Sequence, residues 1–192
     1  MEPVHEEDYK GFKIKIFYDN DGPNPRTEYE HQGTISYWHR RYDIGDDREG
    51  EKLLSHLDEE AHLRPTQEDM ERSGLVFLPV YMHDHSGISI NTTGFSCRWD
   101  SGQLGWIWAK YNPDEYDSRE SLQKVLQSEI EEYDLYLRGE VYGYEITDED
   151  GEFVDSCWGF IGECDGFVLE EARSQCDWYD KQRAVKCIGQ GI

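Results

Sequence analysis

The sequence lacks the features of several common protein classes. Only 19 basic residues face 42 acidic ones, giving a formal net charge of -23. This balance argues against direct binding of nucleic acid or anionic membrane, because both depend on Lys and Arg at phosphates. No apolar run approaches the roughly 18 residues of a membrane helix, and the N-terminus MEPVHEEDYK lacks the pattern of a secretory signal. We therefore expect a cytoplasmic protein that has no membrane partner.

Motifs of the common nucleotide-binding enzymes and hydrolases are also missing. The chain has no Walker loop, no GxGxxG after a strand, no HExxH and no GxSxG. Its five cysteines are an odd set without a CxxC pair, which indicates reduced thiols rather than a disulfide framework. Aromatic residues are plentiful, with six Trp, thirteen Tyr and seven Phe, so we expect a folded domain with a polar surface.

Alternating and helical patterns follow one another along the chain. Strands are predicted over 11–19, 33–39, 75–82, 87–90, 105–111, 140–146 and 152–160, and helices over 51–64, 117–138 and 168–183. The acidic residues 1–10 predict a flexible N-terminus. Because the elements are interspersed and several connections have hairpin length, we predict a single α+β domain over 1–192, a mainly antiparallel sheet packed with two or three helices.

Acidic charge is concentrated in two segments that flank a neutral one. Residues 112–152 carry fourteen acids and three bases, residues 43–71 carry eleven and three, and residues 75–111 are neutral. The neutral segment predicts buried strands, since a core cannot hold uncompensated charge. In the helix 117–138, Asp117 and Glu120 resemble a capping box. Acidic side chains are expected on its outer face and on a second patch: Glu129, Glu131, Glu132 and Asp134, then Asp58, Glu59 and Glu60.

The segment HDHSG holds the most chemically suggestive side chains. His83 and His85 share one face of a strand, as two metal ligands or a base and its helper would, and Cys97 and Asp100 could join them if the strands pair. Cys97 could alternatively act as a nucleophile beside Arg98. The pattern favours polar residues that satisfy a turn and a buried structural cysteine, so we predict no metal, no cofactor and no catalytic residue.

An adjacent basic pair, Arg40 and Arg41, follows His39. Such a pair could hold a phosphate or carboxylate, although ion pairs with nearby aspartates explain it more simply. One hypothesis is therefore a small enzyme or a binding protein for a small ligand or metal, which requires six side chains to converge in space: His39, Arg41, His83, Asp84, His85 and Asp100.

Several stretches together resemble a family of small, largely uncharacterised proteins encoded by bacteriophages and mobile genetic elements. They include GTISYWHRRYDIGD, LPVYMHDHSGISINTTGFSCRWDSGQLGWIW and EYDLYLRGEVYGYEI, and the resemblance covers about 13–162. It implies expression in a bacterial cell but transfers no activity.

Acidic proteins from such elements include inhibitors that occupy the nucleic-acid channels of host nucleases. By that analogy, our first prediction is a non-enzymatic protein whose acidic surface mimics nucleic acid and binds a host defence complex of the restriction or CRISPR type, at its basic nucleic-acid-binding surface. A third hypothesis is an accessory protein whose acidity only maintains solubility.

Overall fold

The computed structural model describes residues 2–58 and 63–189, which fall into two compact units. Unit 1 consists of Met1–Pro23 and Gly139–Ile192, and unit 2 is Asn24–Arg138. Each unit has its own sheet and helix-covered core, so the predicted α+β class with mainly antiparallel strands is confirmed, although two sheets replace the one expected. Whether the units fold as one domain stays a prediction. None of the described helices is long and apolar enough to cross a membrane.

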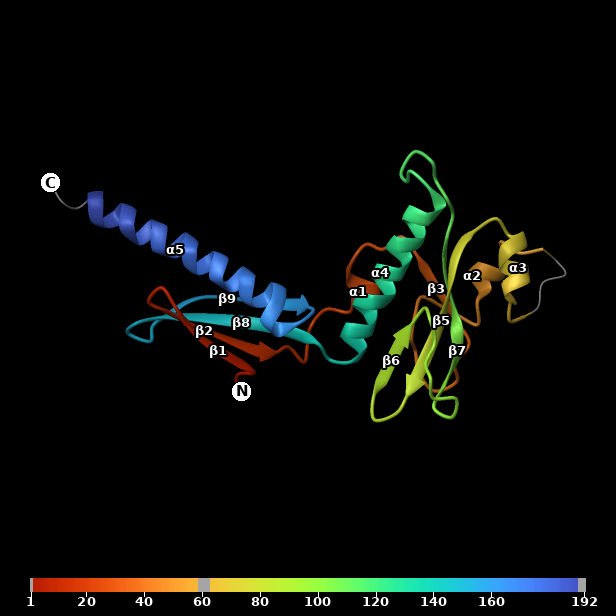
Figure 1. Ribbon diagram of the computed structural model, residues 1–192, viewed down its shortest axis with the longest axis horizontal. Coiled ribbons are helices and arrows are strands. Elements are labelled where there is room, and N and C mark those ends of the chain that lie inside the picture. The colour runs from red at the N-terminus through yellow and green to blue at the C-terminus, as the bar shows by residue number, and fades with distance from the viewer. Residues whose placement is uncertain (1, 59–62, 190–192) are drawn as a thin grey trace. The chain divides into compact units, whose positions relative to one another are not determined.

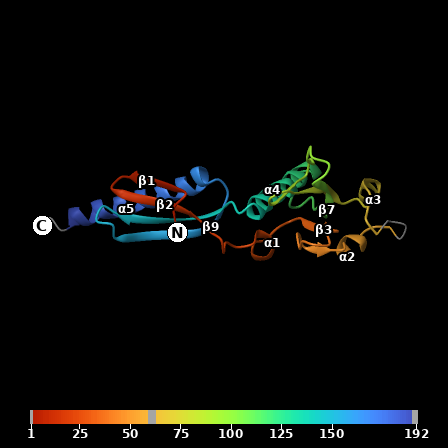
Figure 2. The same cartoon turned by 90° about the horizontal axis from the view of Figure 1, so that it is seen from below.

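Unit 1 is a four-stranded antiparallel sheet covered by one helix (Figures 1 and 2). The strands lie in the order β1 (His5–Tyr9), β2 (Phe12–Tyr18), β8 (Val141–Asp148) and β9 (Phe153–Ile161). The covering helix α5 (Leu169–Gly189) follows the short helical segment η1 (Cys164–Val168). Alternate β2 side chains, Phe12, Ile14 and Ile16, are buried in the core that α5 closes, as their period of two predicts.

The acidic N-terminus is a strand rather than the flexible segment predicted for residues 1–10. His5–Tyr9 pair with β2, and the register sets Glu6 opposite Lys15 and Asp8 opposite Lys13. The Lys13 ammonium lies 3.0 Å from the Asp8 carboxylate. The prediction failed because it weighed the acids of this segment alone, whereas lysines on the neighbouring strand offset their charge.

Unit 2 is a five-stranded sheet with helices on both faces (Figure 1). The strand order is β4 (Asp47–Arg48), β3 (Thr34–Tyr37), β7 (Ser101–Ala109), β5 (Val76–Asp84) and β6 (Ile88–Asn91). Only the β3–β4 pair is parallel. The neutral segment therefore supplies the middle of the sheet, as predicted. The helix α4 (Arg119–Leu137) packs on the face that carries Ile107, and α2 (Glu51–Leu54) and α3 (Gln67–Arg72) pack on the face that carries Trp106 and Trp108.

The boundaries of the helices in unit 2 differ from those predicted. α4 begins after Ser118, whose hydroxyl accepts a hydrogen bond from the Ser121 N–H, so Asp117 is not the cap. The helix expected over 51–64 ends at Leu54, and the unpredicted α3 begins after Thr66. A short α1 (Pro25–Glu28) opens the unit behind the Asn24 cap.

The connection from β6 to β7 is the feature of the fold that positions the site. β6 and β7 flank β5 on opposite sides and run in the same direction, antiparallel to it. Residues 92–100 therefore cross one face of β5 near its C-terminal end, from Asn91 opposite Tyr81 to Ser101 opposite His83. They do so over Tyr81 and His83: Gly94 lies against the Tyr81 ring, and Phe95 stacks on His83 with ring centroids 5.3 Å apart.

Candidate functional site

The loop after β3 brings a basic group to the end of β5. His39 and Tyr42 stack face to face, with ring centroids 5.1 Å apart and an interplanar angle of 3°. The Tyr42 N–H donates to His39 Nδ1, which leaves Nε2 as the protonated nitrogen of the neutral ring. Arg41 donates to the Tyr42 hydroxyl at 3.0 Å, and that hydroxyl donates to Asp84 at 3.2 Å. The Arg41 side chain is 73% exposed, so most of its donors face solvent.

A pocket of about 410 Å³ opens beside this loop. His39 and Arg41 form one wall, and Asp84 at the end of β5 forms another. The remaining wall comes from the start of β7 and the residues before it, including Trp99 and Asp100. Trp99 is 96% exposed, the highest value among the large apolar side chains of the described residues. The pocket thus combines two basic donors, two carboxylates and a free indole face.

A second group of side chains meets at Asp100. The Oδ2 atom of Asp100 lies 3.4 Å from His85 Nδ1, and it accepts the Cys97 thiol at 3.6 Å. One ligand atom each from His83, Cys97 and Asp100 lies within 4.8 Å of the other two. The β5 end is tied to the loop by a backbone hydrogen bond from Asp84 N to Asp100 O at 2.8 Å. We call these four residues the Asp100 cluster: His83, His85, Cys97 and Asp100.

The six residues of the small-ligand hypothesis converge only in part. Four of its six residues line the pocket, namely His39, Arg41, Asp84 and Asp100. The other two, His83 and His85, do not line it and belong to the Asp100 cluster, with their rings 6.0 Å apart. Asp100 connects the two groups.

The sequence led us to expect Glu129 on the outer face of α4, but the side chain is largely buried. Its side chain is 13% exposed, pairs with Arg26 at 2.9 Å and accepts the backbone N–H groups of Gln32 and Gly33. Arg26 is buried and also binds the carboxylate of Asp46. Burial lowers the pKa of the guanidinium, but the bonds to Asp46 and Glu129 outweigh it and raise the pKa above its usual value. Glu129 therefore connects α4 to the chain before β3.

Asp134 is also engaged within unit 2. Its Oδ1 accepts the Ser89 hydroxyl and the Ile90 N–H, both at 2.7 Å, and Oδ2 lies 3.3 Å from Arg138. The outer-face prediction is wrong for this residue too. Glu131 and Glu132 are exposed as predicted. The exposed charged residues of α4 and its C-cap are nearly balanced: Glu120, Glu131 and Glu132 against Arg119, Lys124 and Arg138.

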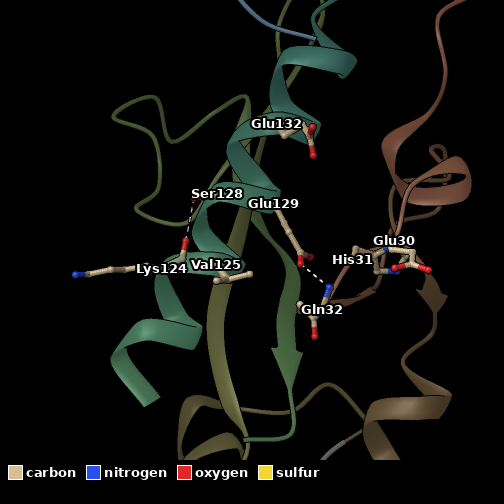
Figure 3. Close-up of a pocket in the computed structure, with 8 residues that line it drawn as sticks. All are labelled: Glu30, His31, Gln32, Lys124, Val125, Ser128, Glu129 and Glu132. Carbon is tan, nitrogen blue, oxygen red and sulfur yellow. Dashed lines mark hydrogen bonds between the residues drawn. The ribbon is translucent and has the colours of Figure 1, made fainter. Parts of the chain in front are cut away.

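A groove of about 570 Å³ lies between α4 and the loop that contains Glu30 (Figure 3). Glu132 lines its α4 side, and Glu129 reaches across it to Gln32. Lys124 points away from that loop in Figure 3. In the second predicted patch, Asp58 is exposed, whereas Glu59 and Glu60 lie outside the described residues.

Sequence reasoning missed two residues of the site. Tyr42 joins Arg41 to Asp84 by hydrogen bonds, and Trp99 stands exposed at the pocket rim. The available signal for Trp99 was its place between Arg98 and Asp100 in a polar loop. A tryptophan without apolar neighbours in sequence is a candidate for an exposed position. For Tyr42, no local pattern announces a hydrogen bond to a residue 42 positions away.

Comparison with known protein families, curated proteins and solved structures found no match for this chain. The resemblance to phage and mobile-element proteins thus stays a prediction.

Proposed function

We propose that the chain is a binding protein for a small acidic ligand, held in the pocket between the loop after β3 and the start of β7. The observation that carries this proposal is the convergence of His39, Arg41, Asp84 and Asp100, which come from three separate parts of the chain. The proposal narrows the small-enzyme or small-ligand hypothesis to binding, because binding is all that these contacts support.

The donors of the pocket favour an anionic group on the ligand. Arg41 presents its guanidinium to solvent, and its 3.7 Å separation from Asp84 leaves donors for a second carboxylate or phosphate. His39 adds its Nε2–H, since Nδ1 is already an acceptor. The two carboxylates of the pocket would accept hydrogen bonds from hydroxyl or amino groups elsewhere on the ligand.

The exposed indole favours a planar body. Trp99 lies almost fully exposed at the pocket rim, so its apolar ring surface is in contact with water. A ligand ring stacked on the indole would bury that surface. A stacked pair contributes about 0.5–1.5 kcal/mol beyond the buried area. The ligand class that fits is a small molecule with a ring, an acidic group and at least one donor.

A thermal-shift screen of acidic, ring-containing metabolites, followed by calorimetry, tests this function. Arg41→Gln should weaken a hit by roughly 10- to 100-fold, because a charge-assisted hydrogen bond is worth about 1.5–3 kcal/mol. Trp99→Ala should weaken it by up to about tenfold. Arg64→Gln is a control, since exposed Arg64 does not line this pocket. Equal loss in all three variants would contradict the pocket assignment.

A second candidate is the binding of a basic partner at the groove beside α4. Glu30 and Glu132 are exposed on its two sides, and exposed Glu131 adjoins them in sequence. A host defence complex with a basic nucleic-acid-binding surface, of the restriction or CRISPR type, is the partner class to test first. The balanced charges on α4 limit this surface to the groove, because they do not form the continuous row that a nucleic-acid mimic needs.

Charge-reversal variants distinguish binding at this groove from attraction by the overall negative charge of the protein. The double variant Glu131→Lys with Glu132→Lys should abolish retention of a purified nuclease complex at low salt. The control, Glu149→Lys with Asp150→Lys, makes the same charge change at exposed positions of unit 1. If both double variants lose the partner equally, the groove is not the binding surface and net charge alone acts.

A further inference from the structure

Three side chains with metal-binding atoms, those of His83, Cys97 and Asp100, meet at the end of β5, and His85 adjoins them through Asp100. Oδ2 of Asp100 lies 3.4 Å from Nδ1 of His85 and 3.6 Å from Sγ of Cys97. His83 brings its own ligand atom within 4.8 Å of those of Cys97 and Asp100. We propose that the Asp100 cluster binds one zinc ion in tetrahedral coordination: His83, His85, Cys97 and Asp100.

Two separations within the cluster already fit such a site. Zinc bonds of about 2.0–2.3 Å at tetrahedral angles place neighbouring ligand atoms about 3.3–3.6 Å apart. The two contacts of Asp100 already lie at 3.4 and 3.6 Å. The ligand atoms of His83, Cys97 and Asp100 lie within 4.8 Å of one another, so a turn of the His83 ring on its Phe95 neighbour brings the three onto one ion. His85 is held beside them by Asp100 and completes the set when its ring turns toward Cys97.

The kinds of ligand atom select the metal. Two imidazoles, a thiolate and a carboxylate suit zinc, whereas magnesium and calcium require mostly oxygen ligands. Cys97 is half-buried, and the Asp100 side chain is 40% exposed, so an ion can enter from solvent. Binding would release the Cys97 thiol proton and replace the S–H contact to Asp100 by two bonds to the metal.

The fold positions these ligands before any ion arrives. The turn after β5 is closed by the hydrogen bond from His85 N to Gly87 O, at 3.2 Å. The crossing segment 92–100 begins in a turn held by Asn91, whose side-chain oxygen accepts the N–H groups of Thr93 and Gly94. It ends where the Asp84 N–H binds the Asp100 carbonyl. Ligands on a prepared backbone lose less conformational entropy when the metal binds.

The zinc site adds a metal to the proposed binding function. The two proposals share one residue, Asp100, which belongs to both the pocket and the cluster, and the zinc site rests on the proposed function only to that extent. A zinc ion requires no ligand in the pocket. The two proposals can therefore fail separately. Cys97 is the residue that tells them apart, because it belongs to the cluster and does not line the pocket.

The test is a titration of the reduced, metal-free, full-length protein with Zn²⁺ and with Co²⁺ as a spectroscopic substitute. We expect one equivalent of either metal and, with Co²⁺, a thiolate charge-transfer band together with the intense visible bands of a tetrahedral site. Zinc should also slow alkylation of Cys97. The absence of a saturable equivalent, or Co²⁺ bound without a thiolate band, would overturn the inference.

Isosteric variants locate the ion. Cys97→Ser should remove the thiolate band. Cys97→Ser and Asp100→Asn should each weaken zinc binding by about 100-fold or more, because mutating even the groups that hydrogen-bond to metal ligands costs about 10- to 100-fold in affinity. The matched control is Cys157→Ser, which changes an exposed cysteine of unit 1. Circular dichroism of each metal-free variant checks the fold. Unchanged zinc affinity in Cys97→Ser, or equal loss in Cys157→Ser, contradicts the site. A pocket ligand that still binds Cys97→Ser would leave the proposed function standing.

Discussion

The two units carry almost equal net charge but use their acids differently. Unit 1 has 19 acids and seven bases, and unit 2 has 23 acids and twelve bases, so the net charges are -12 and -11. In unit 2, Asp46, Glu129 and Asp134 accept backbone N–H groups and join distant segments. In unit 1, Asp19 accepts the Gly159 N–H in the same way, but the turn between β8 and β9 leaves Glu149, Asp150 and Glu152 exposed. The density of acids along a sequence therefore does not locate a binding surface, because the partners of each acid decide its role.

The largest effect is expected when the buried ion pair of unit 2 is removed. Glu129→Ala leaves the buried Arg26 without one of its two carboxylates and removes the acceptor of two backbone N–H groups. We expect a loss of about 3–5 kcal/mol of stability. Hydrogen exchange resolved by peptide should show the loss in unit 2. A loss below 1 kcal/mol would show that Glu129 is a surface carboxylate after all.

A pair of glycine variants compares the two sheets directly. A Cβ at Gly105 in unit 2 would collide with the Ser36 carbonyl of the neighbouring strand, which is backbone and cannot move aside. A Cβ at Gly143 in unit 1 would meet the ring of Trp158, a partly exposed side chain that can rotate away. We expect Gly105→Ala to cost at least about 1–3 kcal/mol and Gly143→Ala to cost less. Thermal unfolding of both variants measures the difference, and the reverse order would contradict it.

Cysteine reactivity should separate thiols within unit 1. Burial, followed by the charge of Asp177, raises the pKa of the Cys176 thiol to about 11, whereas Cys157 is exposed. Because only the thiolate attacks, Cys176 should be alkylated far more slowly than Cys157 at neutral pH. Mass spectrometry of iodoacetamide-treated native protein, with denatured protein as the control, gives the order. Equal rates in the native state would contradict the packing of α5 on its sheet.

The smallest effect is expected at the surface ion pair of unit 1. Arg173 donates two hydrogen bonds to Glu7, and these bonds are the main cause of the lowered pKa of that carboxyl. A lowered folded-state pKa contributes stability above the unfolded value, here 4.5, and this contribution is lost as the pH falls through the folded-state pKa. Arg173→Met should therefore cost little stability at neutral pH and still less in acid. Urea unfolding at several pH values tests it, and a pH-independent cost would point to lost packing instead.

The sequence predicted what depends on local periodicity. The β2 alternation and the α4 stripe of Leu122, Leu126 and Ile130 are buried as their spacing requires. Local pattern failed where two neighbouring residues could serve equally: Asp117 and Ser118 are both good caps, and the backbone selects Ser118.

The candidate site was predictable only in part. Its residue types were visible in HDHSG and in the residues around Asp100, but their meeting depends on the crossing of β5 by residues 92–100, which no local pattern encodes. In the same way, the outer or inner position of Glu129 depends on Arg26, a residue 103 positions away. Contacts between residues so far apart in sequence cannot be predicted from secondary-structure propensity or hydrophobic periodicity.

The most direct test of the account is X-ray absorption spectroscopy at the zinc edge of the protein loaded with one equivalent of zinc. We expect four-coordinate zinc with one sulfur at about 2.3 Å and three nitrogen or oxygen ligands at about 2.0–2.2 Å. The sulfur should vanish in Cys97→Ser and persist in Cys157→Ser. A shell without sulfur, or one of six oxygen and nitrogen atoms, would contradict the claim that the crossing segment over β5 builds a metal site.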